Sequence, residues 1–447
     1  MKTRAERRAA GQALRARVPR SAHAECKLPR TTRDPIAILQ KSNEGRLEHL
    51  LPIRFGRMVQ SPFTFLRGAA AIMAHDLSTL PSTGLEVQAC GDCHLLNFGL
   101  FATPERHLVF DLNDFDETHP APWEWDLKRL VASFAVAGRD VQFSDAKIKD
   151  AVLSCVQSYR RQMRDCANMS PLQVWYQHID AQQLIDEAPD AESRAYRKAI
   201  AEKARRRIVE HLFPKITRSE GKRFRLVDQP PILYHVSEAD FSERVQRGLA
   251  DYRLCLSDDR RVLLDRYQFA DAALKVVGIG SVGTRCYITL LISDENHPLL
   301  LQFKEAGRSV LEPYTAGSAY DNQGQRVVVG QRLMQSSSDI FLGWVRGGRG
   351  RDFYVRQLRD MKMSVPIEGI SFVRFKEYGR ICGRTLARAH AKSGDSAAIS
   401  GYLGNSDNVD RALATFALAY ADQTERDHAA LVKAARAGRI ETLSEES

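Results

Sequence analysis

The feature that most constrains this chain is a pair of short acidic turns. Two runs with strand-like apolar alternation, 85–90 and 107–111, each lead into a turn that carries aspartate and asparagine. Such runs predict a β-hairpin with both turns at its mouth. Asp92, Asn97 and Asp114 would then lie within reach of one cation.

The spacing of these residues favours phosphoryl transfer. Asp92 and Asn97 have the D-x-x-x-x-N spacing of the kinase catalytic loop, and Asp114 has the place of a metal-binding aspartate. One carboxylate can accept a substrate proton while the Asn and a later Asp hold magnesium against nucleotide phosphates. Acidic residues beside Gly and Asn are also common in ordinary turns, so the spacing alone leaves both interpretations open.

The sequence around these residues resembles that of aminoglycoside phosphotransferases and choline-kinase-like enzymes. The family's G-D-x-H-x-x-N, I-D-F-E and P-x-x-D-L-A elements are similar here to Gly91-Asp92-x-His94-x-x-Asn97, Asp114-Phe115-Asp116 and Pro122 with Asp126-Leu127. Over most of residues 50–430 the sequence as a whole also resembles the uncharacterised bacterial domain-of-unknown-function family 2252.

The phosphotransferase resemblance implies a role for each matched residue. Asp92 would be the base or would orient the acceptor hydroxyl, and Asp126 would brace the catalytic loop by capping its amides. His94 would lie behind the loop or face phosphate. The implied magnesium ligands are Asn97 and Asp114, with Asp116 as an alternate.

A glycine-rich turn follows much later in the chain. Two β-branched runs enclose Gly278-Ile279-Gly280-Ser281-Val282-Gly283, and Lys304 lies on the strand after them. Glycines let a backbone approach phosphate closely, and a strand lysine can neutralise phosphates. The turn lacks the Gly-Lys-Ser/Thr of a Walker A loop and is similar to the nucleotide-covering loop of kinases, although Gly283 comes one residue early. The implied nucleotide-binding residues are Gly278, Gly280, Ser281, Gly283, Lys304 and, on a strand suited to hold adenine through main-chain groups, Gln357.

Two helices test how far the kinase resemblance extends. A helix expected at 325–335 takes the place of the kinase regulatory helix but carries no glutamate for Lys304, for which Glu305 and Glu312 are the nearest candidates. A helix expected at 375–392 contains His390 and is similar to the one that precedes the phosphotransferase catalytic loop. Here it follows that loop, so the resemblance implies a circularly permuted chain.

The predicted fold class is α+β, with a two-lobed, protein-kinase-like architecture. Ser144 is expected to cap a helix whose apolar residues recur at helical spacing from 148 to 163. The four predicted parts are a basic, flexible arm (1–45), a helical lobe with the acidic hairpin (46–255), a small antiparallel-sheet lobe over the nucleotide (256–365), and C-terminal helices that return to the helical lobe (366–435).

Charge is concentrated in the arm. Residues 1–30 hold nine Lys or Arg against two Glu, so +7 of the net +10 lies there. We expect a solvated tail, and we expect no contact with nucleic acid except through this arm. No run reaches eighteen apolar residues and the eight cysteines are scattered, so we expect no membrane span and a cytoplasmic location.

The sequence therefore predicts an ATP- and magnesium-dependent phosphotransferase with an unknown phosphate acceptor. One alternative is a metal-dependent phosphohydrolase that uses the acidic cluster together with His94 and Asp111. It leaves the glycine-rich turn and Lys304 without a role. The other alternative is a nucleotide-binding protein without catalytic activity.

Overall fold

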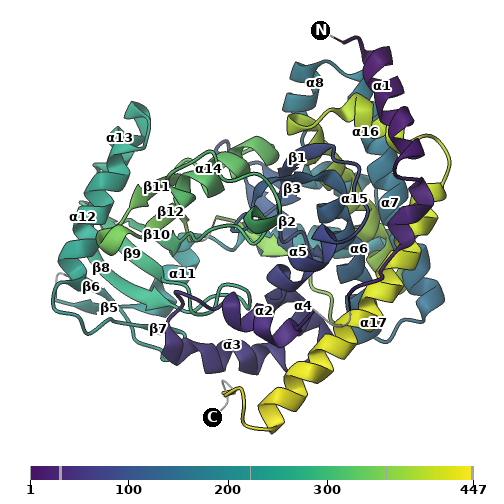
Figure 1. Ribbon diagram of the computed structural model, residues 1–447. Coiled ribbons are helices and arrows are strands. Elements are labelled where there is room, and N and C mark those ends of the chain that lie inside the picture. The colour runs from purple at the N-terminus through teal and green to yellow at the C-terminus, as the bar shows by residue number, and fades with distance from the viewer. Residues whose placement is uncertain (1, 30–32, 222, 359, 444–447) are drawn as a thin grey trace.

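The computed structural model describes residues 2–29, 33–221, 223–358 and 360–443, and it forms two lobes (Figure 1). An antiparallel six-stranded sheet dominates one lobe, drawn in teal and green, and helices dominate the other. The mixed α+β class with antiparallel sheets is confirmed. Within the described residues, no helix is both long and apolar enough to cross a bilayer.

The sheet lobe has the strand order β11-β12-β10-β9-β8-β7. These strands are β7 (Leu233–Tyr234), β8 (Tyr267–Lys275), β9 (Cys286–Ser293), β10 (Pro298–Glu305), β11 (Gly343–Arg346) and β12 (Asp352–Gln357). The lobe also contains α11 (Val209–Ile216), α12 (Phe241–Leu254), α13 (Asp258–Leu264), α14 (Gln323–Met334) and the hairpin of β5 (Thr217–Glu220) and β6 (Arg223–Leu226).

Alternation along β10 separates the two faces of this sheet. Phe303 packs in a buried cluster with Tyr252 of α12 on the outer face. Its neighbours Gln302 and Lys304 point to the opposite face, because successive strand residues alternate. Both line the cleft between the lobes.

In the helical lobe, long helices pack around a three-stranded sheet and a separate pair of strands. Its helices are α1 (Arg4–Ala13), α2 (Pro35–Lys41), α3 (Leu51–Met58), α4 (Pro62–Gly68), α5 (Ala70–Ser78), α6 (Trp123–Asp140), α7 (Asp145–Asn168), α8 (Pro171–Tyr176), α9 (Ala181–Asp186), α10 (Ala191–Arg205), α15 (Phe372–Ser393), α16 (Ser396–Leu403) and α17 (Asn408–Arg436). Ser144 caps α7 by accepting a hydrogen bond from the Lys147 amide, as its position predicts.

The predicted pairing of 85–90 with 107–111 is wrong, although both runs form strands. β1 (Glu86–Ala89) pairs with β4 (His119–Pro122), and β3 (Leu108–Leu112) pairs with β2 (Phe98–Ala102). A third strand, β13 (Met363–Ser364), joins β2 from the other side. The two acidic turns still meet, because the Asn113 amide donates to the Asn97 carbonyl at 2.8 Å.

The N-terminal segment is not the mobile arm that its charge suggests. Gly11 of α1 lies so close to α16 that a Cβ there would be 1.9 Å from the Ala398 carbonyl oxygen. Arg15 donates to the Gly401 and Tyr402 carbonyls, and these groups lie at the negative end of α16. Arg15 therefore stabilises the C-terminal end of α16. Residues 1 and 30–32 lie outside the described part.

The boundary predicted at residue 255, between the helical lobe and the sheet lobe, lies elsewhere in the structure. The chain enters the sheet lobe after α10, because Leu212 and Ile216 of α11 pack with Ile288 and Leu300 of the sheet. It returns after β12, where the Met361 amide donates to the Arg207 carbonyl at 2.9 Å. The two chain crossings between the lobes therefore lie side by side.

Candidate functional site

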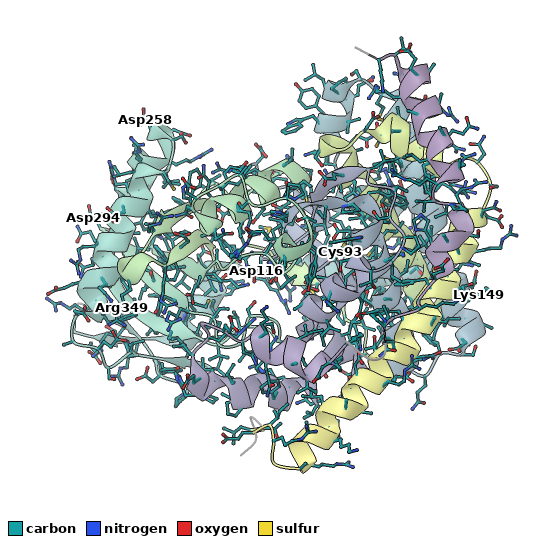
Figure 2. The ribbon with its side chains drawn as sticks, in the orientation of Figure 1. Cys93, Asp116, Lys149, Asp258, Asp294 and Arg349 are labelled. Atoms are coloured by element: carbon teal, nitrogen blue, oxygen red, sulfur yellow. The ribbon has the colours of Figure 1, made fainter. Side chains whose placement is uncertain are left out.

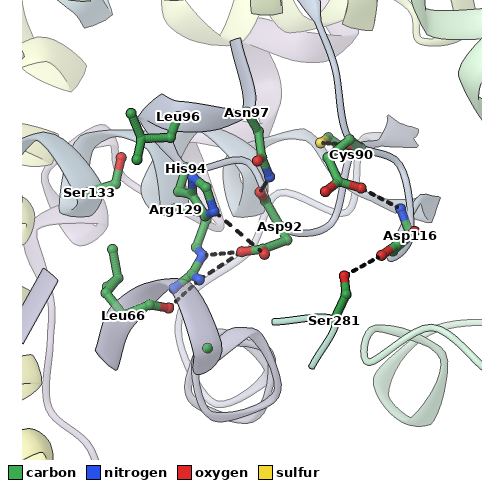
Figure 3. A network of polar contacts seen from close by, with 12 residues as sticks. Leu66, Cys90, Asp92, His94, Leu96, Asn97, Asp116, Arg129, Ser133 and Ser281 are labelled. Carbon is green, nitrogen blue, oxygen red and sulfur yellow. Dashed lines mark hydrogen bonds and ion pairs between the residues drawn. The ribbon is translucent and has the colours of Figure 1, made fainter. Parts of the chain in front are cut away.

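The loop that the sequence predicts to be catalytic is held in place by hydrogen bonds from Arg129 and from the Asn97 side chain. Both Asp92 Oδ1 bonds come from Arg129 of α6, whose Nε and Nη2 donate at 2.9 and 2.7 Å (Figure 3). The Asn97 side-chain amide donates to the Asp92 carbonyl at 2.6 Å. Asp92 remains 20 % exposed, so its carboxylate is oriented without being enclosed.

His94 lies behind this loop and not on its open side. It is 5 % exposed, and its Nε2 is 3.9 Å from Asp92 Oδ2. Burial lowers the pKa of His94 to about 4, so the imidazole is neutral at pH 7. It can pack against the carboxylate but cannot neutralise phosphate charge.

Asp126 caps the start of the same loop. Its carboxylate accepts hydrogen bonds from the Cys90 and Gly91 amides at 2.6 and 2.9 Å. The third neighbour is His390 of α15, whose Nε2 lies 3.1 Å from Asp126 Oδ2. The helix near the end of the chain thus packs beside the loop near its beginning.

Asp116 lies between the lobes and accepts hydrogen bonds from the sheet lobe (Figure 2). Lys304 of β10 donates to its Oδ2, Ser281 donates to the same atom at 3.1 Å, and Tyr354 of β12 donates to Oδ1 at 2.7 Å. Burial opposes the charged form of Lys304, but Asp114 and Asp116 raise its pKa above the usual value. With three donors on two oxygens, Asp116 is poorly suited to bind a metal in this arrangement.

The acid partner of Lys304 is therefore neither Glu305 nor Glu312. Glu305 pairs with Arg285 and Arg351, and Glu312 pairs with Arg308. The helix expected at 325–335 exists as α14, and in place of a glutamate it contributes Arg326. This buried guanidinium donates to the carbonyls of Asp116 and Thr118, so α14 holds the backbone of the acidic turn.

Asp114 and Asn97 keep the oxygen atoms that a hard cation needs. The only hydrogen bond to the Asp114 carboxylate within the described residues is a long one, 3.4 Å, from the Asp116 amide. Burial opposes ionisation of Asp114, but Lys304 and two further cations of the cleft lower its pKa. One carboxylate and one amide oxygen suit magnesium, which keeps several of its waters.

No larger metal cluster accompanies them. Nowhere in the described ranges do three His, Cys, Asp or Glu side chains gather around a common point. Asp111 is fully buried and binds Arg388 at 2.5 Å and Ser336 at 2.8 Å. It cannot serve as the metal ligand that the phosphohydrolase alternative requires.

The glycine-rich turn between β8 and β9 is anchored to the helical lobe. The Gly283 carbonyl accepts from the Leu47 amide at 2.7 Å, and Arg46 donates to the Val282 carbonyl at 2.6 Å. Val282 is fully buried in a cluster with Leu50. Gly278 and Gly283 have φ of +65° and +87°, which glycine adopts at little cost. The Ser281 side chain faces the acidic turn and donates to Asp116.

A cleft of about 320 Å³ lies between the sheet and the acidic turn. Of the residues predicted for the site, Asp114, Gly278, Ser281, Lys304 and Gln357 line it. The others lie behind or beside this cleft, namely Asp92, His94, Asn97, Asp116, Asp126, Gly280 and Gly283.

Gln357 does not offer the free main-chain donor expected of an adenine site. Its amide donates to Asp339 Oδ2 at 2.5 Å, and its side chain donates to Asp339 Oδ1 at 2.7 Å. This end of the cleft carries two cations that the sequence analysis missed, Arg356 and Lys362. Arg356 lies opposite Gln302 in the β10–β12 ladder and therefore on the same face as Lys304, a placement that only the strand register decides.

Comparison with known proteins identifies a family but no individual relative. No curated protein and no solved structure matches the chain. The model of one family, described as uncharacterized protein conserved in bacteria (DUF2252), matches residues 46–434. That span includes both lobes, the acidic turns, the glycine-rich turn and Lys304. The chain belongs to this family.

Proposed function

We propose that this protein is an ATP- and magnesium-dependent phosphotransferase with a circularly permuted kinase-like fold. The observation that carries the proposal is the meeting of Lys304 with the acidic turn across the cleft. Lys304 lies on β10, the third of three consecutive strands whose first two enclose the glycine-rich turn, and the turn with Asp114 and Asp116 comes from the other lobe. Kinases use a glycine-rich loop, a lysine on the third strand and a magnesium-binding aspartate for one purpose, to hold nucleotide phosphates.

In the proposed mechanism Asn97 and Asp114 hold magnesium, which when bound neutralises charge on the phosphate oxygens. Lys304 contacts phosphate beneath the turn that contains Ser281. Asp92, oriented by Arg129, accepts the proton of the acceptor hydroxyl. The fixed orientation of Asp92 supports this role, because a base must lie within hydrogen-bond reach of the proton that it removes.

Product analysis with labelled ATP tests the proposal. Protein with magnesium and γ-labelled ATP is incubated with candidate small molecules and proteins, and labelled products are separated. We expect wild type to transfer label and Asp92→Asn to lose transfer while still binding nucleotide. Asp258→Asn is the matched control, since Asp258 is 96 % exposed at the far end of the sheet lobe (Figure 2). Equal transfer by all three proteins would show that Asp92 is not the base.

A further inference from the structure

Two cations at the end of the cleft next to the chain crossings approach the same oxygen atom. Lys362 Nζ donates to the Asn113 carbonyl at 2.8 Å, and Arg356 Nη1 lies 3.5 Å from the same oxygen. Arg356 also bonds Gln302 Oε1 at 3.1 Å and packs over the Tyr354 ring, 5.4 Å from its centroid. All of these partners are electrically neutral.

Neither cation has a carboxylate within ion-pair distance in the described part of the chain. Asp114 also lines the cleft and both cations lower its pKa, but among the described residues it forms no ion pair with either of them. Two other acids of the cleft are engaged elsewhere. Asp339 binds the Gln357 amide, and Asp360 pairs with Arg106.

Two like charges in a partly enclosed space repel each other and lose hydration, and burial together with Arg356 lowers the pKa of Lys362 to about 7. Keeping both groups charged is therefore costly unless an anion compensates.

We propose that Arg356 and Lys362 form a phosphate-binding subsite, separate from Lys304, at the end of the cleft next to the chain crossings. This inference rests on the proposed function. It adds that an anionic group binds at the end of the cleft where a kinase would hold adenine. A guanidinium and an ammonium together suit phosphate oxygens, since the planar fork of arginine can donate twice and lysine adds a point charge.

The occupied main chain at this end supports phosphate over a base. The Gln357 amide is already bonded to Asp339, so it offers adenine no free donor. Asn113 is 5 % exposed, lines the cleft, and its side-chain nitrogen has no hydrogen-bond partner among the described residues. The phosphate group has two possible sources, the nucleotide's own chain or a phosphorylated second substrate.

Titration with inorganic pyrophosphate tests the subsite without any nucleotide. We expect calorimetric binding to wild type, and a loss of about tenfold or more in affinity for Arg356→Met and for Lys362→Met, since each removes a charge-assisted hydrogen bond. Lys149→Met is the control, because it removes the same charge from an exposed site on the far side of the helical lobe (Figure 2). Unchanged affinity in both cleft variants, or no binding by wild type, overturns the proposal.

Thermal unfolding separates a binding role from a structural one. If the two cations are positioned to bind an anion, they repel each other in the ligand-free protein. Lys362→Met removes this repulsion, so the ligand-free variant should unfold at a higher temperature than the ligand-free wild type. Pyrophosphate should stabilise wild type more than this variant. A lower unfolding temperature with unchanged pyrophosphate affinity would make Lys362 a structural residue and contradict the proposal.

Titration with ATP then distinguishes the two sources. If the phosphate belongs to the nucleotide, Lys362→Met loses affinity for ATP and pyrophosphate alike. If it belongs to a second substrate, ATP affinity is unchanged while pyrophosphate affinity falls. Either pattern supports the subsite. Pyrophosphate binding in a protein that never binds ATP would refute the proposed phosphotransferase function but leave the subsite intact.

Discussion

Lys304 of the sheet lobe and Asp116 of the helical lobe form an ion pair although 188 residues separate them in the chain. The Lys304 side chain is 3 % exposed and the Asp116 side chain 26 % exposed. The pair closes one side of the cleft and fixes the distance between the sheet and the acidic turn. It is one of several contacts that join the lobes, together with the anchored glycine-rich turn and Arg326.

A double-mutant cycle measures this pair. Lys304→Met and Asp116→Asn should each destabilise the protein, because each leaves the other charge without its partner. The double variant should be less destabilised than the sum of the two, with a coupling free energy of roughly 1–2 kcal/mol given the partial exposure of Asp116. Urea denaturation gives the four free energies of unfolding. Strict additivity would show that this ion pair does not help to join the lobes.

Gly91 should tolerate no side chain. It has φ of +85°, and a Cβ there would lie 2.2 Å from the Glu117 carbonyl oxygen, so Gly91→Ala forces the two acidic turns apart. We expect a loss of about 3 kcal/mol or more. Gly45→Ala is a matched control, since Gly45 has φ of +81° and no atom near its Cβ position. Its cost should be only about 1 kcal/mol, the backbone contribution alone. Equal losses would contradict the close approach.

Lys128 gives the protein a specific pH dependence. It is 1 % exposed, its Nζ lies 4.7 Å from the Phe416 ring centroid, and no described group bonds it. Burial lowers its pKa to about 8. The unfolded chain keeps this proton up to about pH 10.4, so the unfolded state binds more protons between the two values. The Lys128 contribution to the free energy of unfolding should therefore rise with pH through this window.

Lys128→Met should remove that rise and increase stability at pH 7 by roughly 1–3 kcal/mol. Urea denaturation at pH 7, 8, 9 and 10 compares it with Lys149→Met, which removes an exposed charge and should leave the curve unchanged. A steep rise that persists in Lys128→Met would assign the pH dependence to another group.

The sheet that carries Lys304 was predictable because its signals are local. Alternation, a glycine-rich turn and a following strand all lie within residues 267–305, and β8, β9 and β10 form as consecutive antiparallel strands. The acidic turns were also found, although the strand pairing was wrong. The actual partners, β4 for the first run and β2 for the second, were not among the predicted strands.

What the sequence could not reveal depends on contacts between distant segments. Arg356 faces the cleft only because β12 pairs with β10 in one register. The basic arm folds because Arg15 reaches carbonyls at the end of α16, 386 residues away. Composition alone suggested a solvated tail. Small residues give a partial signal, since a Cβ at Gly401 would lie 2.1 Å from the Arg8 carbonyl oxygen.

The central claim is that Asp114 and Lys304 hold magnesium and nucleotide phosphate in one cleft. Isothermal titration of ATP, with and without magnesium, tests it most directly. We predict that magnesium strengthens ATP binding to wild type and to Asp92→Asn. Asp114→Asn should lose most of this enhancement, a change of about tenfold or more, since a carboxylate ligand becomes neutral. An absence of ATP binding in both conditions, or an equal magnesium effect in Asp114→Asn, would contradict the account.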